Sequence, residues 1–194
     1  GLSMANVVNT LEMVRPEARS SYKYTGRVRK EYLGPVYPAA AGLLQDRVSP
    51  DDRVLLSYDF TASIHDPVEI NPGLERYAKL TYSPGVKAGN SLFLSGQAAM
   101  DPITEQPVHI GDIVAQTEYV YRNLIMVAEA AGLGPEHFVR VVEFVTPNGS
   151  PRYRHTAAVR KKILREPYPA TTGVLCHGLL RREFEIEIVP MAIG

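Results

Sequence analysis

Residues 22–45 read YKYTGRVRKEYLGPVYPAAAGLLQ, and residues 153–176 read YRHTAAVRKKILREPYPATTGVLC. Without a gap, the two stretches share Tyr, Thr, Val-Arg-Lys, Tyr-Pro-Ala, Gly and Leu at equivalent places, 131 positions apart. The same frame extends to the amino terminus, where Gly1 aligns with Gly132. Self-similarity at a fixed distance indicates that one structural unit occurs twice in the chain.

The repeat is incomplete, because residues 66–131 have no counterpart in the first copy. Their equivalents would lie upstream of Gly1, so the first copy is expected to begin in the middle of a domain. A half-domain would leave apolar faces and strand edges uncovered. We therefore expect residues 1–62 to form the C-terminal half of a domain, 63–78 a linker and 79–194 a complete domain. The alternative is a degenerate extension that packs on the complete domain.

Composition and charge are those of a globular protein without an electrostatic preference. Hydrophobic residues make up 45% of the 194 positions, and 21 basic residues balance 21 acidic ones. A positively charged surface that binds a phosphate backbone is therefore not expected, which disfavours a nucleic-acid partner. The single cysteine, Cys176, is expected to be a small buried thiol. No apolar run is long enough for a membrane span and no secretory signal begins at Gly1, so we expect a cytoplasmic protein without a membrane partner.

Hydrophobic periodicity predicts the order strands, helix, strand, helix and two strands in the complete domain. Asp112 is a suitable N-cap for a helix that Gly132 ends. A second helix is expected at 153–165, with a solvated basic side that includes Arg160. Strands are expected at 92–99, 138–145, 172–176 and 184–189, the first of them paired with residues 82–86. In the first copy, strands are expected at 7–14, 39–44 and 54–60 and a helix at 22–33.

Short motifs are spaced along residues 80–194 in a specific order. They are Tyr82-Ser-Pro-Gly-Val-Lys-Ala-Gly-Asn90, Leu94-Ser-Gly-Gln97, Asp101-Pro102, Gln116-Thr117, Asn123-Leu124, Ala130-Ala-Gly132, Glu166-Pro-Tyr-Pro-Ala170 and Glu185-Ile-Glu187. In this order they resemble the Rid (YjgF/YER057c/UK114) family. The resemblance implies a chorismate-mutase-like α+β fold, in which two helices pack on one face of a mixed sheet. With the repeat, we expect one complete copy and a C-terminal half copy of this fold.

The resemblance also implies how the chain associates. Members of the family form trimers with ligand pockets between subunits, so a homotrimer or a pseudo-hexameric assembly of this kind is expected. A second chain that supplies the missing N-terminal half domain is a further partner that the repeat allows.

The activity that the resemblance implies is hydrolysis of a small enamine or imine in an inter-subunit pocket, which releases ammonia and a keto acid. Such chemistry needs a cation for the substrate carboxylate, a polar group that places water and a group that transfers protons. No cofactor is implied. Carried over residue by residue, the resemblance gives Tyr82, Ser95 and Glu185 roles in catalysis and Gly96 a role in substrate binding. Glu185 and Glu187 alternate with apolar residues, which places both on the same face of a strand.

The chain departs from the family pattern at the carboxylate-binding arginine. The position after Pro169-Ala170 holds Thr171, and the same position of the first copy holds Ala40. Losing a charge-assisted contact costs on the order of 1.5–3 kcal/mol, so standard amino-acid-derived imines are not the expected substrates. A pocket asparagine and a frequent pocket cysteine of the family are replaced by Ala157 and Gly173.

Other side chains are candidates for the substrate contact that the arginine would make. Thr171, Arg154 and His177 are expected to bind substrate, and Arg152 and Arg181 are further sources of a cation. The five histidines lack the spacing of metal ligands, so no metal site is expected.

Two function classes remain beside an enzyme that acts on C=N or C–N bonds. One is a non-catalytic protein that binds a small ligand or serves as a scaffold after the loss of the arginine. The other is the ribonuclease activity attached to some family members, which the neutral net charge disfavours.

Overall fold

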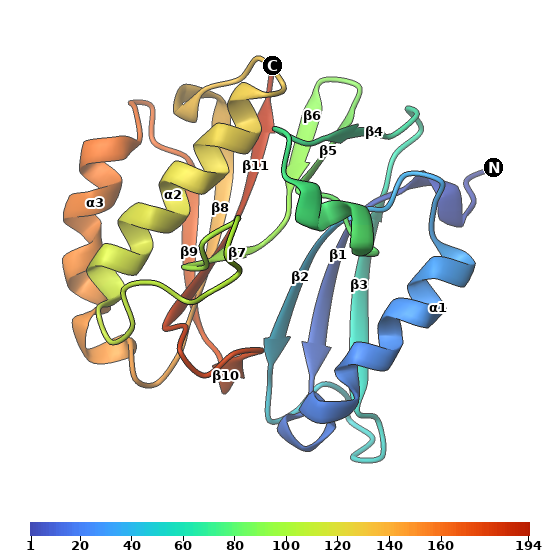
Figure 1. Ribbon diagram of the computed structural model, residues 1–194, viewed down its shortest axis with the longest axis horizontal. Coiled ribbons are helices and arrows are strands. Elements are labelled where there is room, and N and C mark those ends of the chain that lie inside the picture. Colours follow the sequence, from blue (N-terminus) through green and yellow to red (C-terminus); the bar gives the residue numbers. More distant parts are fainter.

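The computed structural model describes residues 1–194, which form two β-sheets and three α-helices (Figure 1). The strands are β1 (Val7–Val14), β2 (Ala39–Leu44), β3 (Leu56–Ala62), β4 (Val68–Ile70), β5 (Gly85–Ala88), β6 (Ser91–Leu94), β7 (Gln97–Ala98), β8 (Phe138–Val145), β9 (Ala170–Leu175), β10 (Gly178–Leu179) and β11 (Ile186–Ile193). The first sheet has the order β10-β2-β1-β3, and the second has the order β4-β5-β6-β11-β8-β9 with β7 paired to β11.

The α-helices are α1 (Thr25–Tyr32), α2 (Ile113–Glu129) and α3 (Thr156–Ile163). Short 3-10 helices precede α1 and α3, namely η2 (Pro16–Tyr24) and η5 (Ser150–His155), so the expected helices at 22–33 and 153–165 begin as 3-10 turns. The others are η1 (Met4–Asn6), η3 (Glu75–Lys79) and η4 (Pro135–His137). No helix is both long and apolar enough to cross a lipid bilayer.

The predicted signals at the ends of α2 are confirmed. The Asp112 carboxylate accepts the N–H groups of Val114 and Ala115 at 3.0 and 3.1 Å, which satisfies two donors that the helix leaves free. Beyond the helix, Gly132 has a φ of +75°, a left-handed conformation that glycine adopts without strain.

The strand expected at 92–99 is broken in two. β5 and β6 form a hairpin in which Gly89, at a φ of +60°, occupies a two-residue turn. β6 ends at Leu94, and β7 begins at Gln97 after the pair Ser95-Gly96. At this break the main-chain groups leave the second sheet and turn towards the first.

Residues 63–78, expected to be a linker, contain regular structure. β4 adds to the edge of β5, with Val68 opposite Lys87 and Ile70 opposite Gly85. The helix η3 follows and lies across the front of the first sheet (Figure 1). It carries Tyr77, which is buried.

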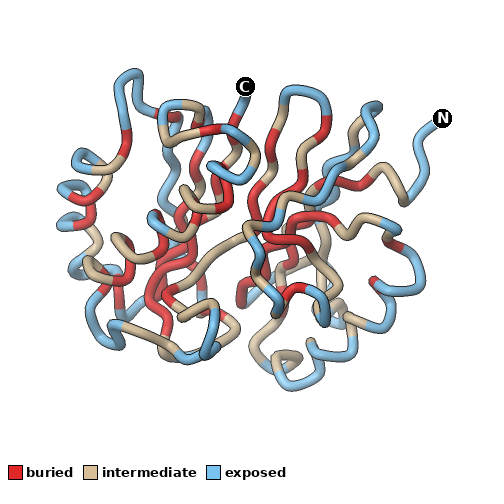
Figure 2. The backbone as a smooth tube through the Cα atoms, turned by 45° about the horizontal axis from the view of Figure 1, so that its top comes forward, coloured by how far each residue is buried: buried red, intermediate tan, exposed pale blue.

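Helices α2 and α3 lie side by side on one face of the second sheet (Figure 1). The main core lies there, and it joins apolar residues of both helices to those of β6, β8 and β11. Figure 2 shows that buried residues follow the strands of both sheets, whereas the outer turns of the helices are exposed. This burial of one helix face against a sheet is the α+β arrangement that the resemblance implies.

A second, smaller core joins the two sheets. Leu43 of β2 belongs to it together with Phe144, Cys176, Leu179 and Phe184. Cys176 is the buried thiol that the sequence predicts, and its burial raises the pKa to about 11. The sheets therefore form one packed body.

The element order of residues 1–62 recurs in residues 132–194. β1, α1 and β2 begin 131 positions before β8, α3 and β9, and in both groups the first and last of these strands are parallel. The antiparallel partner of the first strand follows at 130 positions, because Val14 is opposite Leu56 and Val145 is opposite Ile186.

Candidate functional site

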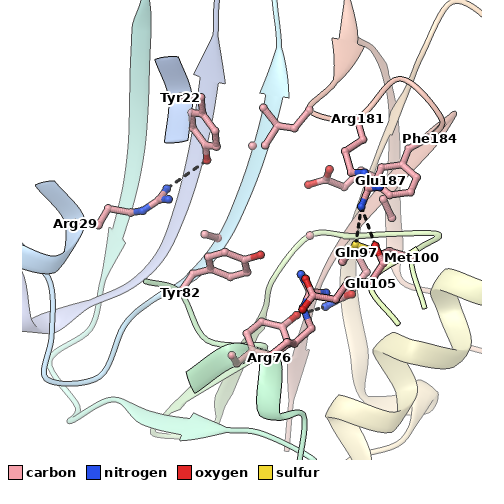
Figure 3. Close-up of a pocket in the computed structure, with 16 residues that line it drawn as sticks. Tyr22, Arg29, Arg76, Tyr82, Gln97, Met100, Glu105, Arg181, Phe184 and Glu187 are labelled. Carbon is pink, nitrogen blue, oxygen red and sulfur yellow. Dashed lines mark hydrogen bonds between the residues drawn. The ribbon is translucent and has the colours of Figure 1, made fainter. Parts of the chain in front are cut away.

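A cavity of about 300 Å³ lies where the edge of β2 meets β7 and the start of β11. Its lining comes from both sheets of a single chain, whereas the expected pocket lies between subunits. Figure 3 shows Tyr22 and Arg29 on one side, Tyr82 and Arg76 below, and Arg181 and Glu187 on the other side.

Hydrogen bonds at the break between β6 and β7 hold the first sheet against the second. The N–H of Gly96 donates to the Ala40 carbonyl at 3.0 Å. The Ser95 hydroxyl donates to the Ser83 carbonyl at 2.6 Å and accepts the N–H of Ala40 at 2.8 Å. Ser95 is fully buried and does not line the cavity, so its hydroxyl lies in the wall.

Gly96 lines the cavity and leaves room for an acid. A Cβ atom at this position would overlap Oε1 of Glu187 and would lie 2.8 Å from the Ala41 side chain. The absence of a side chain at Gly96 therefore allows the Glu187 carboxyl and β2 to lie close to the main chain of this residue.

Glu187 is the buried acid of the cavity. It lies on β11 between Phe144 of β8 and Ala98 of β7, and it is 8% exposed. Burial raises the pKa of its carboxyl to about 8, and the nearby N–H of Gly42 only partly offsets this. The carboxyl is therefore mostly protonated at neutral pH, and it can donate a proton or a hydrogen bond.

Glu185, for which a role in catalysis is expected, lies directly before β11 and outside the cavity. Its two carboxylate oxygens each accept a hydrogen bond from Arg152 at 3.0 Å. Its main-chain N–H donates to the Gln116 side chain at 2.8 Å. Of the two glutamates in the alternating segment 184–189, the structure brings Glu187 to the cavity.

Tyr82 reaches the cavity, as the resemblance implies. Its ring packs edge-on against Tyr77 at 5.6 Å, and burial raises the pKa of its hydroxyl to about 12. The hydroxyl is thus neutral and forms no hydrogen bond with the other lining residues (Figure 3). Gln97 donates to the Tyr77 hydroxyl at 3.0 Å, which fixes the neighbouring ring.

The three residues expected to bind substrate beside Gly96 lie elsewhere. Thr171 is exposed on β9, and Arg154 is exposed and contacts His155. His177 pairs with Asp46 at 2.6 Å in a separate hollow. The physical reason is that the Pro-Ala segment that reaches the cavity belongs to the first copy, so Ala40 rather than Thr171 faces it.

A buried ion pair forms the wall beside Ala40. Nη1 of Arg29 donates to both oxygens of Glu12, at 2.6 and 2.7 Å, and the Tyr22 hydroxyl donates to the same carboxylate at 2.7 Å. The hydroxyl of Tyr22 also lies close to Gly42, where an added Cβ would be 2.8 Å away. The sequence interpretation did not identify this cluster.

The second copy carries the same cluster. Tyr153 and Arg160 each donate to Oε2 of Glu143 at 2.6 Å, and Tyr121 of α2 donates to Oε1 at 2.7 Å. Arg160 is therefore mostly buried, with 20% of its side chain exposed, and the expectation of a solvated face is wrong for this residue. The shared Tyr, Arg and Glu of the repeat provided a signal for the cluster.

Arg76, Arg181 and Gln97 also line the cavity and were not singled out as a group. Gln97 ends the motif Leu94-Ser-Gly-Gln97, and Arg181 is one of the expected sources of a cation. Arg76 lies in the expected linker, where no motif marks it. No group of three or more His, Cys, Asp or Glu side chains is placed to hold a metal ion.

Comparison with known proteins shows the family of the chain. The family model described as endoribonuclease L-PSP matches residues 74–193. The chain is 48% identical over 64 residues to protein DfrA of Myxococcus xanthus, a match to 33% of this chain and 48% of DfrA. It is 32% identical over 94 residues to a 2-iminobutanoate/2-iminopropanoate deaminase of Dermatophagoides farinae, which covers 48% of this chain and 70% of that protein.

A solved structure shares the fold at similar identity. The RidA protein of the Antarctic bacterium Psychrobacter sp. PAMC 21119 is 31% identical and superposes with a TM-score of 0.54, over 59% of this chain and 89% of that one. The chain spans about half the length of several curated relatives that it matches. Because the family model covers more than half of the residues, the chain belongs to the Rid (YjgF/YER057c/UK114) family, whose model is described as endoribonuclease L-PSP.

Proposed function

We propose that the cavity between the two sheets hydrolyses a small imine or enamine and releases ammonia and a carbonyl product. The observation that carries this proposal is the protonated, buried carboxyl of Glu187 at the cavity surface. A general acid is most effective when its pKa lies near the working pH, and about 8 meets that condition. One relative with 32% identity is named as an imine deaminase, which supports the same reaction class.

The proposed reaction uses one water molecule and returns the acid to its starting form. Glu187 gives its proton to the imine nitrogen, which makes the imine carbon more electrophilic. Water adds to that carbon, and the Glu187 carboxylate accepts a proton from the water oxygen. The same carboxyl passes this proton to the nitrogen. The C–N bond then breaks and ammonia leaves, while the hydroxyl group forms the C=O bond and returns its proton to the Glu187 carboxylate. The neutral Tyr82 hydroxyl can hold the water or the developing oxygen by a hydrogen bond.

Ammonia release from an imine tests this proposal. An imine generated in place by an amino-acid oxidase decays spontaneously, so the measurement is the acceleration by the chain over that background. Glu187→Gln should lose the acceleration, since the amide keeps the shape but has no proton to exchange. Glu129→Gln, on the exposed end of α2, is the matched control and should keep it. Equal rates for wild type and Glu187→Gln would contradict the proposal.

The same assay also tests Glu185, for which the resemblance implies a role in catalysis. Glu185→Gln removes a charge that Arg152 neutralises outside the cavity. Loss of ammonia release in Glu185→Gln, with full activity in Glu187→Gln, would transfer the role in catalysis to Glu185.

A non-catalytic ligand-binding protein is the second candidate. The absence of an arginine at both Ala40 and Thr171 favours it, because the family's carboxylate contact is missing in both copies. Ligand binding in the cavity without any acceleration of imine decay would identify this second function.

We also propose that residues 1–62 are the C-terminal half of a second Rid domain, and that the chain works in a larger Rid-type assembly. Two exposure differences support this. Val28 of α1 is 51% exposed, whereas Val159 of α3 at the equivalent place is 5% exposed. All six residues of β2 are buried, whereas β9 is mostly exposed. A homotrimer, a pseudo-hexamer or a second chain that brings the missing half would cover these faces, and native mass spectrometry of the natural protein would distinguish them.

A further inference from the structure

The positive charges that line the cavity differ in whether an acid neutralises them. Arg29 is paired with Glu12 at 2.6 Å, and its Nε atom donates to Thr81. Arg76 and Arg181 also line the cavity, and neither forms an ion pair with any acid of the chain.

Arg76 has an unused donor. Its Nε atom is buried and has no hydrogen-bond partner, and its guanidinium lies 5.2 Å from the centre of the Tyr77 ring. A buried N–H without an acceptor is destabilising, because it has lost its bonds to water without replacement. The guanidinium forms no hydrogen bond within the chain, so its N–H donors remain for a ligand. The donor edge of a guanidinium matches the two oxygens of a carboxylate.

Arg181 is held in place by neutral groups. One of its terminal nitrogens donates to the Glu105 carbonyl at 3.0 Å and contacts the Met100 sulfur at 3.4 Å, and its guanidinium lies 5.6 Å from the Phe184 ring. These contacts fix the group without cancelling its charge.

The acids of the cavity do not cancel these two charges. Glu187 is mostly protonated at neutral pH. Glu105 is exposed, and its carboxylate is not within ion-pair distance of either arginine. The lining therefore carries an excess of positive charge, which attracts an anion.

We propose that Arg76 binds the carboxylate of the substrate in this cavity. This assignment rests on the hydrolysis proposed for the same cavity. It replaces the missing cation after Pro38-Ala39 by one from η3, which lines the cavity together with Ala40. Arg181 adds a second, longer-range attraction for the same anion. The carboxylate then lies towards η3, and the C=N carbon lies towards Gly96 and Glu187.

Binding of 2-oxobutanoate to the full chain, measured by isothermal titration calorimetry, separates this assignment from catalysis. This 2-oxo acid carries the carboxylate but has no C=N bond to hydrolyse. Arg76→Gln should weaken binding about 10- to 100-fold, the loss of one charge-assisted contact. Arg76→Lys keeps the charge but cannot donate two parallel hydrogen bonds to a carboxylate. Its affinity should lie between those of the wild type and Arg76→Gln. Lys79→Gln removes a charge from the exposed end of the same 3-10 helix, outside the cavity, and should bind as wild type does.

The outcomes for the two proposals are distinct. Glu187→Gln should lose ammonia release, and its binding of 2-oxobutanoate should still depend on Arg76. Binding that depends on Arg76 in a wild type without hydrolysis would support the assignment and contradict the proposed function. Equal binding by wild type and Arg76→Gln, or no binding by wild type at millimolar ligand, would overturn the assignment even if hydrolysis is observed. Unchanged thermal unfolding of each variant shows that the fold is intact.

Discussion

The side-chain oxygen of Ser95 accepts the main-chain N–H of Ala40 at 2.8 Å, and both residues are buried where they meet. This contact joins the segment between β6 and β7 to the edge of β2. It therefore places the wall contributed by residues 1–62 against the part of the second sheet that carries Gly96 and Glu187. The cavity lies between the two sheets, and this contact fixes the position of one sheet relative to the other.

Ser95→Ala is expected to lower stability by about 1–3 kcal/mol, because the Ala40 N–H and the Ser83 carbonyl lose a buried partner. Urea unfolding measures this change. Ser20→Ala, on the exposed side of η2, is the matched control and should be neutral. If Ser95→Ala abolishes ammonia release without any loss of stability, Ser95 acts in catalysis as the resemblance implies, and the interpretation as a wall residue is wrong.

Glu187 is expected to make the stability of the chain decrease as the pH rises. Its folded-state pKa of about 8 exceeds the ordinary value of 4.5, so the folded protein binds a proton that the unfolded chain has released. The stabilisation is complete below pH 4.5 and is lost as the pH rises through 8. The full difference corresponds to about 5 kcal/mol at most.

Unfolding in urea at several pH values between 4.5 and 8 measures this dependence. Glu187→Gln should flatten it, because the amide does not titrate. Ammonia release should fall over the upper part of the same range as the acid form disappears. A wild-type stability that stays constant from pH 4.5 to 8 would contradict a buried neutral carboxyl at this position.

Arg160→Ala is expected to destabilise the chain by about 3–5 kcal/mol. Glu143 is fully buried, and removal of Arg160 leaves its charge without the cation at 2.6 Å. Thermal or urea unfolding provides the measurement, and Lys161→Ala at the exposed next position should change stability little. Equal losses for the two variants would show that the ion pair contributes nothing beyond the loss of a long side chain.

The error over Arg160 shows where sequence reasoning reached its limit. Periodicity and end signals are local, and they predicted β8 and the whole of α2 from Asp112 onwards. The partner of Arg160 lies on a strand 17 positions earlier, and burial of that pair depends on how a helix packs on a sheet. A single basic run cannot reveal which of its members turns inwards.

The residues of the candidate site could also be predicted only in part from the sequence. The motifs singled out Tyr82 and Gly96, which belong to one contiguous segment of the chain, and both line the cavity. The choice of Thr171 over Ala40 depended on which copy of Pro-Ala meets that segment, and this is a matter of tertiary contact between distant parts of the chain. Arg76 lies in a segment without a motif, so only its unpartnered Nε atom in the folded chain identified it.

Leu175→Asp is expected to prevent association without unfolding the chain. Leu175 is 61% exposed on β9, whereas Leu44, at the same place of the first copy, is 4% exposed. β2 is covered because Ser83, Ser95, Gly96 and β10 all approach its edge, and β9 offers the same edge without a partner.

A charge on β9 should therefore weaken any assembly that covers this strand, because burial of an unpaired carboxylate is costly. Sedimentation velocity measures the change in association, and Ile103→Asp, at an 87% exposed loop position, is the matched control. Thermal unfolding of Leu175→Asp should match that of the dissociated wild type, since the side chain makes no core contact within one chain. Association that persists in Leu175→Asp, or a wild type that stays monomeric at every concentration, would mean that β9 is an exposed edge and that the first copy serves only to complete the cavity.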